Sequence, residues 1–294
     1  MADSAAHPTP DLVNYVDAEG VEIHAYHWAA VDPIASVHIS HGVGEHALRY
    51  DAFARALANA GFAVYADDHR GHGETGRAQH GGDLARLGKL GPGGLRATEA
   101  AIEQFAGMIR SRHAGLPLIA FAHSWGSLMA QRIINRSPHL YDAVVLSGTA
   151  FRTVRFMESG ALNARWQSPK ANGFEWLSRD PATAAAFIAD PLCFDARIPK
   201  LFGLADAARL LGKPGPALAA DVPILIIGGS DDPLSKSDGL ERLAAAYRAR
   251  GVLDVALRIY PEARHELLNE FDRDIVTAEV ITWMLEHVGG PRAD

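Results

Sequence analysis

A serine at position 124 stands between a strand-like and a helix-like stretch of this 294-residue chain. The apolar residues 118–122 suffice for one buried strand, and apolar side chains recur at helical spacing through residues 128–134. Ala122 and Gly126, two positions before and after Ser124, are small enough for the backbone to turn sharply between them. This variant of the G-x-S-x-G pattern predicts a serine hydroxyl held above a sheet edge as a nucleophile, although a helix N-cap serine is the alternative.

The composition is typical of a large globular enzyme domain. Hydrophobic residues make up 48% and charged residues 21% of the chain. A net charge of −7 without a dense Lys/Arg run argues against a nucleic-acid partner. The single cysteine, Cys193, excludes an internal disulfide. No stretch has the roughly 20 apolar residues of a transmembrane segment, and residues 1–10 lack a signal-peptide pattern. We therefore expect a cytoplasmic protein.

Strand-like and helix-like stretches alternate along most of the chain. Strands are expected at residues 12–16, 21–28, 37–40, 62–66, 143–146, 223–227 and 255–259, and helices at residues 50–60, 98–110 and 271–287. The first two strands should pair through a turn at residues 18–20. Because helices separate most of the other strands, the pattern predicts an α/β fold with a mostly parallel sheet and helices on both faces.

The alternation stops between residues 150 and 220. This stretch lacks a clean strand pattern and contains several prolines and eight aromatic residues: Phe151, Phe156, Trp166, Phe174, Trp176, Phe187, Phe194 and Phe202. We interpret residues 150–220 as an inserted, mainly helical cap segment that divides the core into residues 1–149 and 221–294. Such rigid apolar surface suits a lid over an apolar pocket, but a segment packed only on itself and on the core would look the same.

A serine hydroxyl needs a base to accept its proton and a carboxylate to orient that base. The base is expected to be His265, in the loop after the last strand, because His287 lies deep in the final helical pattern. Asp231 and Asp232 follow the preceding strand, at the sheet edge where ligands bind in open α/β sheets. Spacing alone leaves the choice open, since either aspartate could face the site or cap the next helix.

Two backbone amides are expected to stabilise the oxyanion of an acyl-transfer intermediate. One is the amide of Trp125, directly after the serine and at the positive end of a helix. The other is the amide of Val43, in a loop where Gly42 and Gly44 allow the backbone to turn its N–H groups inward. A simple glycine turn is the alternative interpretation of this loop.

Four segments together resemble the monoacylglycerol lipase and lysophospholipase group of α/β-hydrolases, within the serine aminopeptidase S33 type. They are residues 41–46 (HGVGEH), 68–73 (DHRGHG), 122–126 (AHSWG) and 260–266 (YPEARHE), and the cap stretches 177–181 (LSRDP) and 189–192 (ADPL) add to them. The resemblance spans residues 20–287. It implies an α/β-hydrolase fold, hydrolysis of single-chain lipid esters through an acyl-serine and no cofactor.

Carried over residue by residue, the resemblance makes Ser124 the nucleophile, Asp232 the orienting acid and His265 the base. It also makes Val43 and Trp125 the oxyanion-hole amides, and it favours Asp232 over Asp231. Trp125 replaces the more usual methionine, so we expect its bulk to narrow the acyl site. In the cap, the aromatic residues expected to contact the substrate are Phe151, Trp166 and Trp176.

The sequence also allows other functions. A broad esterase for small or aromatic monoesters would use the same residues, as would a peroxidase or a carbon–carbon bond hydrolase. A non-catalytic receptor would keep the fold and bind a ligand under the cap. The carboxylates and imidazoles of residues 67–72 suggest a metal site, but no H-x-H-x-D-H or H-E-x-x-H string accompanies them, so no metal is expected. The expected partner is a small-molecule or lipid ester, with transient contact between the cap and a membrane surface as a further expectation.

Overall fold

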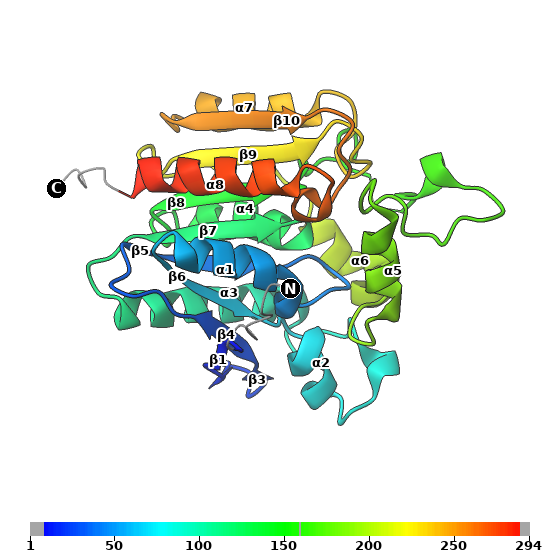
Figure 1. Cartoon of the computed structure of the whole chain (residues 1–294), viewed down its shortest axis with the longest axis horizontal. Helices are drawn as coiled ribbons and strands as arrows, with labels where there is room; N and C mark the ends of the chain where they lie inside the picture. Colours follow the sequence, from blue (N-terminus) through cyan, green and yellow to red (C-terminus); the bar gives the residue numbers. More distant parts are fainter. Residues whose placement is uncertain (1–8, 159, 289–294) are drawn as a thin grey trace, which may run out of the picture.

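The computed structural model describes residues 9–158 and 160–288 and contains a central eight-stranded sheet (Figure 1). The strand order is β1-β4-β6-β5-β7-β8-β9-β10. The parallel strands are β5 (Ala35–Ser40), β6 (Phe62–Asp67), β7 (Leu118–His123), β8 (Ala143–Ser147), β9 (Ile224–Gly229) and β10 (Val255–Tyr260). At one edge β4 (Ala25–Trp28) and β1 (Asp11–Leu12) run antiparallel. The predicted mostly parallel sheet is confirmed.

Helices cover both faces of this sheet (Figure 1). Outside the cap segment they are α1 (Asp51–Asn59), α2 (Gly73–Gln79), α3 (Gly94–Arg112), α4 (Trp125–Arg136), α7 (Gly239–Ala249) and α8 (Arg273–His287), with short 3₁₀ turns η1 (Ala47–Tyr50), η2 (Leu84–Arg86) and η4 (Leu267–Asn269). The apolar sides of α1 and α8 pack on one face of the sheet, and those of α3, α4 and α7 pack on the other. Strands buried on both faces need continuous apolar runs, as in β7, where every residue is buried.

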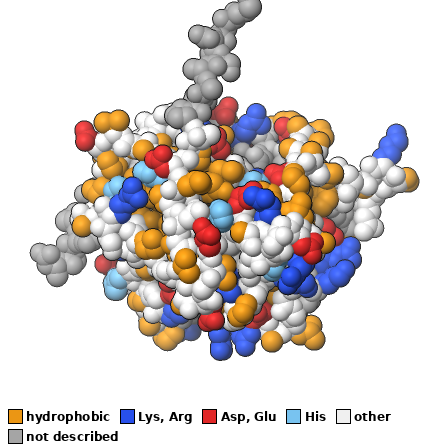
Figure 2. Space-filling model, turned by 90° about the horizontal axis from the view of Figure 1, so that it is seen from below, with side chains coloured by type: hydrophobic (Ala, Val, Ile, Leu, Met, Phe, Trp, Pro, Cys, Tyr) orange, Lys and Arg blue, Asp and Glu red, His pale blue; other side chains and the backbone are white. Residues whose placement is uncertain are grey.

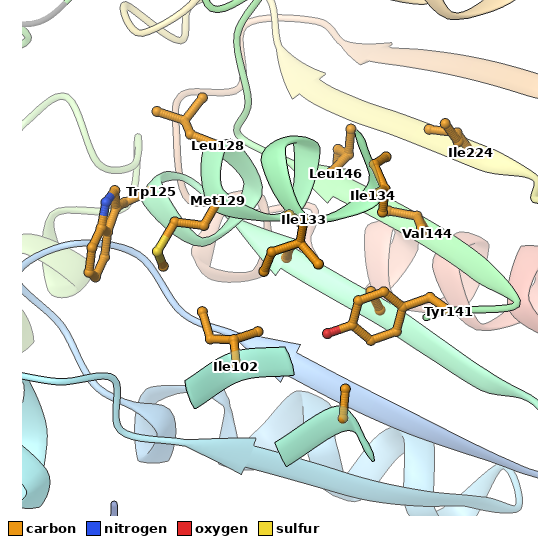
Figure 3. Packing of buried hydrophobic residues seen from close by; sticks show 14 of the residues in the cluster. Ile102, Trp125, Leu128, Met129, Ile133, Ile134, Tyr141, Val144, Leu146 and Ile224 are labelled. Carbon is orange, nitrogen blue, oxygen red and sulfur yellow. The ribbon is translucent and has the colours of Figure 1, made fainter. Parts of the chain in front are cut away.

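Figure 3 shows one of these two cores. Ile133 and Ile134 of α4 lie in one cluster with Val144 of β8 and Ile102 of α3. These side chains are at most 2% exposed. Burial of each such side chain contributes about 1.5–3 kcal/mol to stability, so this packing fixes where α4 begins relative to the strand ends.

The first predicted hairpin forms in two parts. Residues 12–16 contribute to β1 and to β2 (Tyr15–Val16), and β2 pairs with β3 (Glu22–Ile23) in a separate small sheet. β1 instead pairs with β4 of the main sheet. The pairing predicted from the alternating pattern is therefore confirmed, but a break between β3 and β4 divides it between two sheets.

The cap segment (residues 150–220) lies between β8 and β9, beyond the carboxyl ends of the parallel strands (Figure 1). Its helical elements are η3 (Ala164–Trp166), α5 (Pro181–Ala189) and α6 (Ile198–Arg209). Gly203 has φ 77° and kinks α6, a backbone conformation that glycine adopts without strain. Its helical content agrees with the sequence interpretation, and the domain boundaries at residues 150 and 220 stay a prediction.

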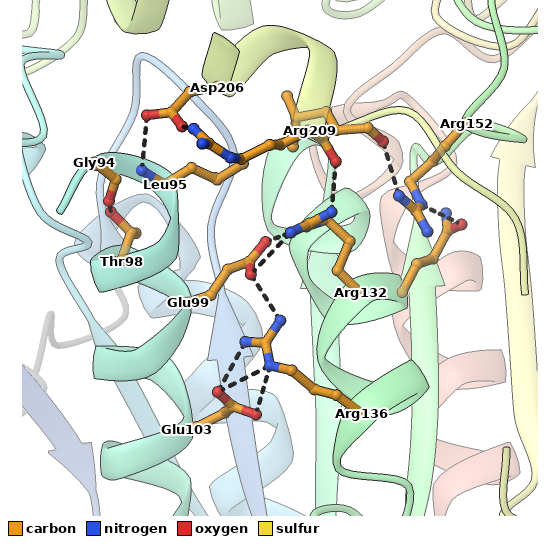
Figure 4. A network of polar contacts seen from close by, with 12 residues as sticks. Gly94, Leu95, Thr98, Glu99, Glu103, Arg132, Arg136, Arg152, Asp206 and Arg209 are labelled. Carbon is orange, nitrogen blue, oxygen red and sulfur yellow. Dashed lines mark hydrogen bonds and ion pairs between the residues drawn. The ribbon is translucent and has the colours of Figure 1, made fainter. Parts of the chain in front are cut away.

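Buried and half-buried polar contacts fasten the end of the cap segment to the core (Figure 4). Arg132 of α4 forms an ion pair with Glu99 of α3 and donates a hydrogen bond of 2.5 Å to the carbonyl oxygen of Arg209. Arg152, 2% exposed, donates to the Leu210 carbonyl at 2.8 Å. Because both arginines satisfy carbonyls at the end of α6, they hold that end of the cap against the core.

On the face shown in Figure 2, acidic and basic side chains are mixed and the hydrophobic side chains are scattered among them. Among the described residues, no helix combines the length and the apolar character that crossing a membrane requires.

Candidate active site

Ser124 lies at the turn between β7 and α4, as the sequence predicts. Its backbone has φ 51° and ψ −123°, a sparsely populated conformation that costs on the order of 1–3 kcal/mol. The Ser124 N–H donates to the Ser147 carbonyl on β8 at 2.9 Å, which helps to hold the turn. A Cβ on Gly126 would lie 2.4 Å from the Ser40 carbonyl oxygen, so this position requires glycine. The flanking small residues therefore permit the close approach of β5, β7 and α4.

The structure brings Ser124, Asp232 and His265 together from three separate loops. His265 Nε2 lies 2.8 Å from Ser124 Oγ, and His265 Nδ1 lies 2.9 Å from Asp232 Oδ2. With the proton on Nδ1 donated to the carboxylate, Nε2 is free to accept the serine proton. Asp231 instead faces Arg165 at 2.9 Å, with its side chain 30% exposed. The geometry thus distinguishes the two aspartates, which spacing could not.

The site contains two adjacent imidazoles with opposite protonation behaviour. Burial lowers the pKa of His265, but the charge of Asp232 and the hydrogen bond to it raise that pKa above its ordinary value. Burial lowers the pKa of His123 to about 3. The two ring centroids lie 4.7 Å apart. His123 is therefore neutral near pH 7, and His265 is the imidazole able to take up a proton.

Two backbone amides border the serine. Gly42 packs so closely that an added Cβ would lie 3.0 Å from the Ser124 Cβ, and Val43 follows it in the loop after β5. Trp125 is the first residue of α4, where a backbone N–H has no acceptor within the helix. Val43, Ser124 and Trp125 line the same cavity. The arrangement places two candidate oxyanion donors beside one hydroxyl.

The hydroxyl opens into a cavity of about 840 Å³ between the sheet edge and the cap segment. Trp176 lines it, with its ring centroid 4.7 Å from that of His265. Phe174, Phe187 and Phe194 of the cap also line it, although the sequence did not distinguish these rings from the others.

Two aromatic residues expected at the substrate are placed elsewhere. Phe151 and Trp166 are not among the residues that line the cavity. Phe151 is 9% exposed and stacks on Phe156, with ring centroids 5.9 Å apart. The Trp166 ring packs under the Arg264 guanidinium at 4.6 Å. One ring is thus used in the core and the other in a cation–π contact, so neither supports the substrate-binding role that we expected.

The Trp125 ring is buried at the cavity wall. It stacks on His72 at 5.0 Å and contacts Phe202 of α6 at 5.1 Å, measured between ring centroids, and is 1% exposed. These contacts join the loop after β6 to the cap segment. The narrowing of the acyl site by this ring stays a prediction.

Of the residues that suggested a metal site, Asp67 and His69 bind each other, and Asp67 also binds His38 of β5. Asp67 Oδ1 lies 3.1 Å from His38 Nε2, and Asp67 Oδ2 lies 3.0 Å from His69 Nδ1. His69 Nε2 in turn lies 2.9 Å from Ser40 Oγ. This buried chain of hydrogen bonds supports the end of β5, from which the glycine loop leaves.

The chain is similar to known proteins over most of its length. The family model described as "Serine aminopeptidase, S33" matches residues 31–272. A monoacylglycerol lipase from Mycolicibacterium smegmatis is 32% identical, over 87% of this chain and 90% of that protein. The monoglyceride lipase of Mus musculus is 25% identical, over 97% and 94%. A thermostable carboxyl esterase from Bacillus coagulans superimposes with a TM-score of 0.82 at 23% identity, covering 96% of this chain and 100% of that one, and shares the fold.

Proposed function

The chain belongs to the serine aminopeptidase S33 family of α/β-hydrolases, and from this premise we propose that it hydrolyses single-chain lipid esters of the monoacylglycerol or lysophospholipid type. It is a serine hydrolase. The observation that carries the proposal is the continuous contact from Asp232 through His265 to Ser124, with the hydroxyl facing a capped cavity.

In the proposed mechanism, Ser124 Oγ attacks the ester carbonyl and its proton passes to His265 Nε2. Asp232 holds the imidazole and stabilises its charged form, while the amides of Val43 and Trp125 donate to the oxyanion. Collapse breaks the ester bond, and His265 returns the proton to the leaving alcohol. Water then attacks the acyl-serine by the same steps, which releases the fatty acid and restores the hydroxyl.

The aromatic side chains of the cap that line the cavity favour a lipid tail as the bound group. A second candidate, an esterase for smaller or more polar monoesters, is favoured by the polar residues that line another part of the cavity. These residues are Asn163, Gln167, Ser168 and Asn172. Contact of the cap with a membrane surface and a cytoplasmic location stay predictions.

The direct test is labelling with a fluorophosphonate probe. The wild type should react, and Ser124→Ala should abolish labelling and lower turnover by on the order of 10³-fold or more, because only binding and oxyanion stabilisation remain. Ser111→Ala is the matched control, since its hydroxyl donates to the Gly107 carbonyl on the exposed side of α3. Labelling that persists in Ser124→Ala would place the nucleophile elsewhere. An unlabelled wild type would support a non-catalytic receptor.

A further inference from the structure

Glu45 holds the glycine loop close to the serine, since a Cβ added to Gly42 would lie 2.7 Å from Glu45 Oε1 and 3.0 Å from Ser124 Cβ. Its Oε1 accepts hydrogen bonds from the Gly42 N–H at 2.6 Å and from the Tyr50 hydroxyl at 2.7 Å. The side chain is only 5% exposed. Because the Gly42 amide is committed to this carboxylate, the turn is fixed and the next amide, that of Val43, is left for an oxyanion.

Arg49 joins this carboxylate to the loop that carries His265. Its Nη1 lies 2.5 Å from Glu45 Oε2 and 2.8 Å from Glu266 Oε1, and its Nη2 lies 2.8 Å from Glu266 Oε2. Glu266 directly follows His265. One guanidinium thus connects two loops that are more than 200 residues apart in sequence, and its planar, bidentate geometry restricts their relative position.

The three side chains also carry a net charge of −1 beside His265. Burial lowers the pKa of His265, the charge of Asp232 and its hydrogen bond raise it most, and the charges of Glu266 and Glu45 raise it further. Two rings also pack against the imidazole, that of His123, which is neutral near pH 7, and that of Trp176 from the cap. The positive charge of Arg49 offsets the negative charge of only one of the two carboxylates.

We propose that Glu45, Arg49 and Glu266 form a positioning network that holds the oxyanion loop against the His265 loop and favours the charged form of His265 during catalysis. This inference rests on the proposed ester hydrolysis. None of the three side chains takes part in the bond-making steps, so each acts through the groups that it holds.

The test separates the charge from the geometry. Glu45→Gln keeps an acceptor for the Gly42 N–H but removes a negative charge, and Glu266→Gln removes the other. In each of these two variants, kcat should fall about 10- to 100-fold, and KM should stay within about threefold of the wild-type value. The reason is that a misplaced oxyanion donor or base stabilises the transition state less well. Less negative charge lowers the pKa of His265, so the acid limb of kcat/KM should move down by about half a pH unit or more.

Arg49→Lys keeps the charge but loses the fork that bridges both carboxylates. Its kcat should fall similarly, whereas its acid limb should stay at the wild-type pH. Arg55→Lys is the matched control, since Arg55 forms an ion pair with Asp51 on the adjoining helix, and it should leave both quantities unchanged. Thermal unfolding checks that each variant is folded, and if one carboxylate variant fails to fold the other one decides.

Wild-type kcat and an unshifted acid limb in the folded carboxylate variants would overturn the network while leaving the proposed function intact. A wild type that neither reacts with fluorophosphonate nor hydrolyses an ester would instead contradict the proposed function itself.

Discussion

Asp231 and Asp232 are neighbours in sequence but have different surroundings, and this difference predicts different mutational effects. Asp232→Asn should lower kcat by on the order of 10³- to 10⁴-fold, because His265 loses the partner that fixes its tautomer and stabilises its charge. Asp231→Asn should change kcat less than about threefold, since its partner Arg165 is 62% exposed and exposed ion pairs contribute little. Steady-state kinetics on one ester measures both.

The two variants control for each other, because each removes one charge from the same loop. Losses of equal size would contradict the assignment of Asp232 as the orienting acid.

The sequence predicted those site residues whose placement depends on local rules. The small neighbours of Ser124 specify a sharp turn, and the strand ends specify which loops carry Asp232 and His265. The direction of a side chain is not local, so the sequence pattern alone left Asp231 and Asp232 undecided. For the same reason Glu45 was seen only as part of a motif, although its link to Glu266 is made by an arginine four residues further along.

At the scale of elements, α2 and α7 were not predicted. In α7 the helical signal was present but was missed. Leu240, Leu243 and Tyr247 recur at helical spacing, and all three are buried. In α2 the signal was weak, since the sequence GETGRAQ contains two glycines. That helix is joined to a distant part of the chain by a hydrogen bond of 2.8 Å from the His24 N–H to Thr75 Oγ1. No window of local sequence contains this information reliably.

The cap segment shows the limit of counting aromatic residues. Its composition indicated apolar surface over a site, but not which rings face the cavity. Trp176 lines the cavity, whereas Trp166 packs under Arg264. The difference depends on contacts with distant residues, such as that of Trp166 with Arg264 in the loop after β10.

The placement of these two tryptophans predicts how the enzyme depends on acyl chain length. Each added methylene buried in the cavity contributes about 0.8 kcal/mol, so kcat/KM should rise roughly three- to fourfold per methylene until the cavity is full. Trp176→Ala should lower the slope of log kcat/KM against chain length. Trp166→Ala is the matched control and should leave the slope unchanged. A graded series of p-nitrophenyl and glyceryl esters supplies the measurement.

Trp176 also contacts His265, so Trp176→Ala could slow the hydrolysis of every ester. Such a uniform loss would lower log kcat/KM at every chain length but would leave the slope unchanged. A flat profile in the wild type would contradict the lipid assignment and support the small-ester esterase.

At the scale of the whole molecule, the buried imidazoles around the site make stability depend on pH. Burial lowers the pKa of His72 and of His123 to about 3, and it lowers the pKa of His41 well below its ordinary value. In the unfolded chain each would titrate near about pH 6.5. Below that pH the unfolded chain binds protons that the folded chain excludes, so the free energy of unfolding falls with decreasing pH.

The expected slope is about 1.4 kcal/mol per pH unit for each such imidazole, between about pH 6.5 and the folded-state pKa. His265 behaves oppositely: its raised pKa stabilises the fold below about pH 6.5, and this contribution is lost as pH rises through the folded pKa, so it adds no slope in the acid window. Urea unfolding at about pH 5, 6 and 7 measures the effect, and His72→Gln should reduce the slope by about one proton. An unchanged slope in that variant would mean that His72 is already protonated in the folded protein, in conflict with a ring that is fully buried against Trp125.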